Sequence, residues 1–172
     1  LDDWSDALGA HLQGIGVGQG DPVALFLNNC PQYLVAHYAI QKIGAIVCPC
    51  GPLNKAHELQ YQLDDLGARV IIAADNLLPI VDQVRGDTAL THVLAARYGD
   101  LLPAEPDLPV PPEIQGAPSP LPVGCADMLQ IARTGAQAGV RPSPVTIGMD
   151  DVALMTYTSG TTGLPKGAML SY

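Results

Sequence analysis

Apolar residues recur along the first hundred positions in two alternating patterns. In some segments they stand three or four positions apart, as on one face of a helix, and in others they form short unbroken runs. The helical stripes lie within 1–15, 33–43, 59–66 and 77–84, and the apolar runs lie within 22–27, 45–47, 69–73 and 92–95. Helices and strands that alternate in this way predict an α/β fold with a parallel, doubly wound sheet and flanking helices.

Prolines interrupt this pattern after position 102. Eight of the 16 prolines fall between Pro103 and Pro122, which is too many for a helix or a paired strand. We therefore expect a surface linker over 103–147, with a short helix at about 127–133 and a loop from 135 to 147. The division is 1–102 for the βα-alternating part, which is incomplete at its start, 103–147 for the linker, and 148–172 for a final strand, a loop and a second strand.

Composition narrows the function classes. The formal net charge of −9 argues against nucleic acid or an anionic membrane surface as a partner. The sequence has no run of about 18 apolar residues, so we expect no transmembrane helix. The cysteines at 30, 48, 50 and 125 lack the spacing of a zinc site and are interpreted as reduced, hydrophobic residues. The pair Asp64-Asp65 is interpreted as part of a solvated helix face.

A segment rich in glycine and hydroxyl residues follows the last apolar strand, 152–157. It reads Tyr-Thr-Ser-Gly-Thr-Thr-Gly-Leu-Pro-Lys-Gly from position 157 to 167. Glycines let backbone N–H groups approach an anion, hydroxyls add donors, and Lys166 supplies a compact positive charge. These are the requirements for holding a polyphosphate, although a simple hairpin rich in Ser, Thr and Gly is the alternative. The sequence argues against a Walker loop, which needs Gly before the lysine and Ser or Thr after it, because Pro165 and Gly167 flank Lys166. The next segment, 167–172, is also expected to be a strand and not a helix.

This segment resembles the signature of the adenylate-forming superfamily, which includes acyl-CoA synthetases, firefly-type luciferases and peptide-synthetase adenylation domains. The resemblance extends in the correct order through 20–24, 42–49 and 58–74, and 97–103 is similar to long-chain fatty acyl-CoA ligases. It implies an incomplete N-terminal domain of the adenylate-forming fold that ends at the phosphate-loop signature. The resemblance also implies ATP, Mg²⁺ and CoA as cofactor and co-substrates, with a carboxylate, most simply a fatty acid, as the substrate.

The resemblance assigns roles to particular positions. The expected ATP-phosphate contacts are Thr158, Ser159, Gly160, Thr161, Thr162, Gly163 and Lys166. Thr158 is also a candidate Mg²⁺ contact, and Tyr172 stands where many relatives have a histidine that lines the acyl side of the site. Catalytic residues are expected beyond Tyr172, in a missing C-terminal part, so the 172-residue chain alone is expected to be inactive.

Alternative functions remain open at this point. The parent could be another adenylating enzyme, such as an acyl-AMP ligase, an aryl-CoA ligase or a peptide-synthetase adenylation domain. It could also be a non-catalytic, ATP-binding remnant. The reduced cysteines favour a cytoplasmic location, and the resemblance adds that fatty-acid ligases often work beside membranes.

Overall fold

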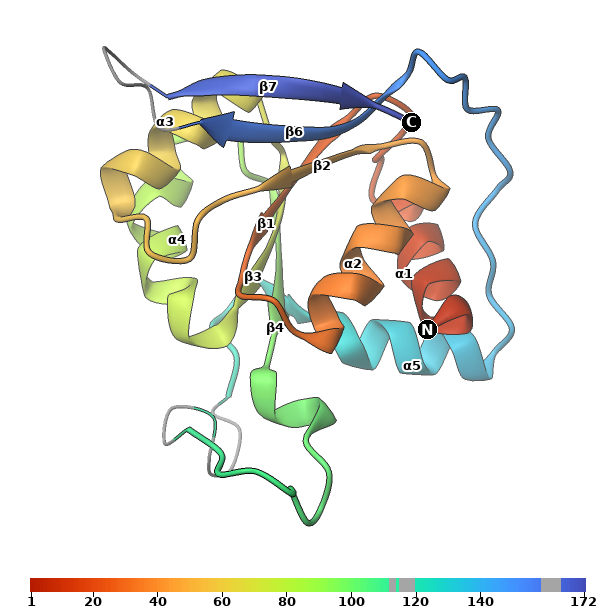
Figure 1. The fold of residues 1–172 in the computed structure, drawn as a ribbon, viewed down its shortest axis with the longest axis vertical. Helices are drawn as coiled ribbons and strands as arrows, with labels where there is room; N and C mark the ends of the chain where they lie inside the picture. Colours follow the sequence, from red (N-terminus) through yellow and green to blue (C-terminus); the bar gives the residue numbers. More distant parts are fainter. Residues whose placement is uncertain (112–113, 115–119, 159–164) are drawn as a thin grey trace.

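The strands of the chain form a strongly twisted sheet. The computed structural model describes residues 1–111, 114, 120–158 and 165–172. Within them the strands are β1 (Pro22–Phe26), β2 (Ile46–Pro49), β3 (Val70–Ala74), β4 (His92–Ala96), β5 (Cys125–Asp127), β6 (Val152–Thr158) and β7 (Lys166–Ser171). Their order is β5-β4-β3-β1-β2-β6-β7 (Figure 1). All neighbours pair in parallel except the edge pair β6–β7, which is antiparallel.

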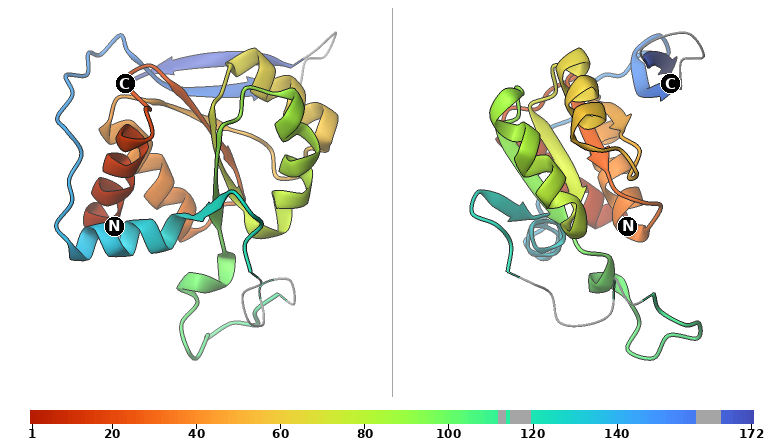
Figure 2. Two further views of the ribbon diagram at one scale, coloured as in Figure 1. Left: turned by 180° about the vertical axis from the view of Figure 1, so that it is seen from behind. Right: turned by 90° about the vertical axis from the view of Figure 1, so that its left-hand side faces the viewer.

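Helices cover both faces of this sheet. The described α-helices are α1 (Asp2–Gly14), α2 (Pro31–Lys42), α3 (Ala56–Leu66), α4 (Leu78–Val84) and α5 (Met128–Gln137). Helices α1, α2 and α5 pack together on one face, and α3 and α4 lie on the other (Figure 2). Among the helices that the structure describes, none has the length and apolar character needed to span a bilayer.

Two hydrophobic cores explain why the central strands β1 and β3 are apolar at every position. Side chains along a strand point alternately to opposite faces. Accordingly, Val23 and Leu25 of β1 lie in the core beneath α1, α2 and α5, whereas Ala24 and Phe26 lie in the core beneath α3 and α4. A parallel strand that is covered on both faces must therefore read as a continuous apolar run. The doubly wound sheet predicted from the sequence is confirmed.

Local sequence signals set the helix ends. Pro31 begins α2, where its missing N–H has no helical partner to lose. Gly67 follows α3 in the left-handed conformation, with φ of 61°, which a glycine adopts without the strain of a Cβ atom. The four predicted helical stripes correspond to α1–α4, with their ends displaced by a few residues, as is usual for boundaries.

The segment 103–147 differs from its prediction in two respects. The short strand β5, which pairs with β4, was missed. The helix predicted at about 127–133 begins at Met128 and continues to Gln137, so it includes Gly135, which had been placed in a loop. A Cβ atom at Gly135 would lie 2.8 Å from the Cβ atom of Ala7, so this glycine allows α5 to approach α1 closely. The three-part division of the chain stays a prediction.

An extended connection, 138–151, joins α5 to β6 along the outer side of α1 (Figure 1). Gln13 of α1 exchanges two hydrogen bonds with the backbone of Ser143, at 3.0 and 2.7 Å. Arg141 forms an ion pair with Asp3 at 2.8 Å and a second one with Asp6. Side chains of α1 therefore hold this connection, which leads to Val152, the first residue of β6; the predicted phosphate loop follows the other end of that strand.

Candidate functional site

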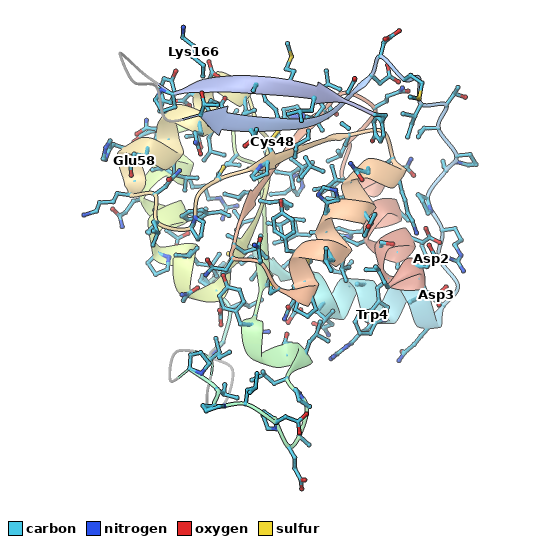
Figure 3. All side chains as sticks on the ribbon, viewed as in Figure 1. Asp2, Asp3, Trp4, Cys48, Glu58 and Lys166 are labelled. Atoms are coloured by element: carbon cyan, nitrogen blue, oxygen red, sulfur yellow. The ribbon has the colours of Figure 1, made fainter. Side chains whose placement is uncertain are left out.

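The two ends of the predicted phosphate loop face each other across the β6–β7 hairpin. Thr158 is the last residue of β6 and Lys166 the first of β7, and the two are register partners. The Thr158 hydroxyl donates to the Lys166 carbonyl oxygen at 3.5 Å. The exposed Lys166 side chain lies at the outer edge of the molecule (Figure 3). The predicted contacts Ser159, Gly160, Thr161, Thr162 and Gly163 lie outside the described residues.

A cleft of about 890 Å³ opens beside these loop ends. It lies at the carboxyl ends of β1, β2 and β6, which is where ligands bind in open α/β sheets. Its walls come from the turn after β1, helix α2, the segment between β2 and α3, helix α3 and the hairpin. They include Leu27, Tyr33, Pro49, His57, Thr158 and Pro165. Apolar walls with a few polar side chains suit a small-molecule ligand.

Helix α3 contacts both flanks of the loop. The Tyr61 hydroxyl donates to the carbonyl oxygen of Pro165 at 2.9 Å, and the Tyr157 hydroxyl donates to Asp65 Oδ2 at 2.5 Å. Burial raises the pKa of the Tyr157 phenol, and the hydrogen bond to Asp65 raises it further. The sequence analysis missed both contacts and interpreted Asp65 as solvated. Asp65 is indeed exposed, yet it accepts this hydrogen bond. The available signal was the spacing of Tyr61 and Asp65, which puts them one helical turn apart.

The cysteines near the cleft are suited to packing. Cys50 lines the cleft, and Cys48 is buried on β2. Burial raises the pKa of each thiol to about 12, so both stay protonated at neutral pH. A protonated thiol is a weak nucleophile and a poor metal ligand. In the part of the chain that the structure describes, no group of three or more His, Cys, Asp or Glu residues is placed to hold a metal ion.

Tyr172 lies at the opposite end of β7 from Lys166. Its backbone N–H donates to the Asp151 carbonyl oxygen at 3.2 Å, and its hydroxyl donates to the Gln41 carbonyl oxygen at 3.1 Å, at the end of α2. The structure therefore places Thr158 on the cleft wall and Lys166 opposite it in the hairpin, outside the cleft lining, and it leaves Tyr172 apart from both. Its role as a wall of an acyl site stays a prediction.

The arrangement defines a class: a three-layer α/β protein whose antiparallel β6–β7 hairpin borders a cleft through Thr158 and Pro165. Comparison with known proteins specifies the family within this class. Residues 1–172 all match the AMP-binding enzyme family, and the chain belongs to it.

Individual relatives agree with this assignment. The chain is 35% identical over 175 residues to the long-chain-fatty-acid–CoA ligase of Salmonella typhimurium, and the match covers 100% of the chain and 31% of the ligase. With the corresponding ligase of Bacillus subtilis it shares 31% identity over 179 residues, covering 96% of the chain and 30% of the relative. The chain therefore spans about a third of the length of these curated relatives.

Solved structures have the same fold. The anthranilate CoA ligase AuaEII, in complex with anthranoyl-AMP, superimposes with a TM-score of 0.77 at 25% sequence identity. The match covers 98% of the chain and 28% of AuaEII. The mixed sheet with its flanking helices is therefore that of the N-terminal domain of adenylate-forming enzymes.

Proposed function

We propose that the chain supplies the phosphate-binding part of an ATP-dependent acid–thiol ligase. In the proposed reaction, a carboxylate oxygen of the substrate attacks the α-phosphorus of ATP, and pyrophosphate leaves with the bond electrons. The sulfur of CoA then attacks the carbonyl carbon of the acyl-adenylate, and AMP leaves. A fatty acid is the first candidate substrate, supported by the similarity to long-chain-fatty-acid–CoA ligases over the whole chain.

The observation that carries the proposal is the position of the loop ends. Thr158 and Pro165 line the cleft, and Lys166 follows directly at the start of β7. In the proposal, the segment Thr158–Gly163 surrounds the β- and γ-phosphates of ATP. Lys166 offsets their charge and the charge that develops on the leaving pyrophosphate. A fixed positive charge at a site of developing negative charge lowers the barrier, because it needs no reorganisation during the reaction.

Mg²⁺ would reach this site together with ATP. Mg²⁺ is usually held by one or two carboxylates together with substrate phosphates and water. Within the described residues the cleft offers the Thr158 hydroxyl and the Glu58 carboxylate. Glu58 Oε2 already accepts the Lys55 backbone N–H at 2.8 Å. Among the described residues, Glu58 is thus the only carboxylate that lines the cleft, and they form no complete Mg²⁺ site.

An aromatic carboxylate is the second candidate substrate. The chain is 31% identical over 166 residues to 4-coumarate–CoA ligase 3 of Oryza sativa. The structure of AuaEII contains anthranoyl-AMP. In the proposal, Tyr172 keeps an aromatic side chain on the acyl side of the site for either class of acid.

The test is carboxylate-dependent exchange of labelled pyrophosphate into ATP, measured on the complete gene product. Fatty acids of several lengths, aromatic acids and amino acids would be compared, with and without CoA. Lys166→Ala should lower the exchange rate about 100-fold, the typical effect of removing one preorganised stabilising group. Lys55→Ala is the matched control, since Lys55 is exposed and its contact with Glu58 uses only the backbone.

Exchange that requires one class of carboxylate and depends on Lys166 would support the proposal and identify the substrate class. Exchange without thioester formation would favour an acyl-AMP ligase or an adenylation domain. A folded protein that binds ATP but shows no exchange with any acid would refute the ligase and favour a non-catalytic ATP-binding protein.

A further inference from the structure

The end of the β6–β7 hairpin that carries the loop extends beyond the parallel part of the sheet. The register between β2 and β6 contains the single pair Val47–Leu154, whereas β6 continues to Thr158. On its outer side, every residue of β7 is exposed. Strand pairing with β2 therefore fixes the beginning of β6 and leaves its loop end to be held by other contacts.

Helix α3 provides these contacts from two side chains that are four residues apart. Residues i and i+4 of a helix lie one above the other on the same face. The Tyr61 hydroxyl donates to the carbonyl oxygen of Pro165, the residue that precedes β7. Asp65 accepts the hydroxyl of Tyr157, the residue that precedes the loop on the β6 side. One face of α3 thus holds both flanks of the segment 158–165.

The residues that α3 contacts on the two flanks, Tyr157 and Pro165, also form part of the cleft wall. Tyr61, Tyr157 and Pro165 all line the cleft together with Thr158. A change at Tyr61 or Asp65 would therefore shift the loop ends relative to the cleft without removing any of the predicted phosphate contacts. Such displacements matter because preorganised groups lose most of their effect when they are misplaced by about 1 Å.

We propose that Tyr61 and Asp65 are positioning residues that fix both ends of the phosphate-binding segment against the cleft. Their catalytic effect rests on the proposed function, but the contacts themselves can be tested without it. Loss of either contact leaves the loop sequence intact and loosens one of its flanks. The affinity for ATP then falls, while the carboxylate site, to which neither residue is assigned, keeps its affinity.

The experiment uses Tyr61→Phe and Asp65→Ala in the complete gene product. Tyr38→Phe and Asp64→Ala are the matched controls, because both residues are exposed and neither lines the cleft. The first measurement is the rate of tryptic cleavage after Lys166 under native conditions, followed by the peptide that ends there. The second measurement is the KM for ATP and for the carboxylate in pyrophosphate exchange, together with kcat and the unfolding midpoint.

Each test variant should accelerate cleavage after Lys166 and raise the KM for ATP about three- to tenfold, as expected for loss of one hydrogen bond. The KM for the carboxylate and the unfolding midpoint should match the controls. Asp65→Asn, which keeps an acceptor oxygen, should restore part of the effect. Cleavage and a KM for ATP equal to those of the controls would overturn the proposal. A lower kcat and a lower unfolding midpoint with an unchanged KM would also overturn it, since that pattern indicates a purely structural role.

Absence of exchange with every acid in the unmodified protein would refute the proposed ligase function. Cleavage after Lys166 would then decide the positioning role alone: faster cleavage in both test variants supports it, and control-like cleavage overturns it.

Discussion

Asp127 joins helix α5 to the sheet through two contacts made by one carboxylate. Its Oδ1 atom accepts the backbone N–H of Gln130 at 2.9 Å and so caps the start of α5. Its Oδ2 atom accepts from Arg97 Nη1 at 2.5 Å, and Arg97 directly follows β4. The side chains of Arg97 and Asp127 are only 15% and 19% exposed, so water screens the pair weakly. Replacement of Asp127 therefore tests how firmly α5 is fixed to the sheet.

The two contacts can be separated by two substitutions. Asp127→Asn keeps an oxygen that can cap the helix but removes the charge, and we expect a loss of about 2 kcal/mol of unfolding free energy, typical of a charge-assisted hydrogen bond. Asp127→Ala also removes the cap, which adds about 1 kcal/mol. The expected total for Asp127→Ala is therefore about 3 kcal/mol. Asp107→Ala, at an exposed position in the proline-rich segment, is the control and should change stability little.

Trp4 offers a local probe for this experiment. It is the only tryptophan in the chain, and the Arg133 guanidinium of α5 lies 5.5 Å from the centre of its ring. Urea unfolding would be followed by two signals. Trp4 fluorescence reports the contact between α1 and α5, and far-ultraviolet circular dichroism reports the whole fold. If Asp127→Ala were as stable as Asp107→Ala, neither contact would contribute. If Asp127→Asn and Asp127→Ala lost the same free energy, the cap would contribute nothing.

Three further predictions concern pH, packing and activity. Burial holds the pKa of His37 below its ordinary value of 6.5. Folding thus favours the neutral His37 ring. The stability that the neutral ring contributes is complete above its ordinary pKa of 6.5 and is lost as the pH falls through the lower pKa of the folded state. As the pH is lowered from about 7.5 to about 5.5, the urea midpoint should fall, and it should fall less in His37→Gln. An equal fall of the midpoint in both proteins would contradict this assignment. Gly135→Val should lose about 1–3 kcal/mol of unfolding free energy by forcing α5 away from Ala7, whereas Gly86→Val, with open space around it, should be nearly neutral in the same assay. The 172-residue chain alone should form no acyl-adenylate, because one wall of a site cannot hold ATP and carboxylate together; adenylate detected by mass spectrometry would contradict this.

Much of the fold followed from residues adjacent in the sequence. The run at 22–27 predicted β1, because a strand buried on both faces needs an apolar side chain at every position. Pro31 and Gly67 marked helix ends through backbone preferences that do not depend on the rest of the protein. Such local signals determined the alternation of strands and helices, and the alternation determined the parallel sheet.

The missed elements depend on contacts between distant segments. Strand β5 has three residues, too few to show a period, and it exists because it pairs with β4. Gly135 resembles a helix breaker in isolation, since glycine destabilises a helix interior. In the structure it lies where α5 crosses α1 and where any Cβ atom would meet Ala7. Tertiary packing thus outweighs the local preference at this position.

The same distinction separates the two parts of the candidate site. The hydroxyls, glycines and Lys166 indicated phosphate binding because their chemistry is contained in one continuous segment. Glycine restricts the backbone less than any other residue, so a glycine-rich segment does little to fix its own position. The groups that place it must therefore come from outside it. Tyr61 and Asp65 contact Pro165 and Tyr157 only in the folded chain. The composition of the loop could therefore suggest a chemistry for it, but it could not identify the residues that contact its two flanks.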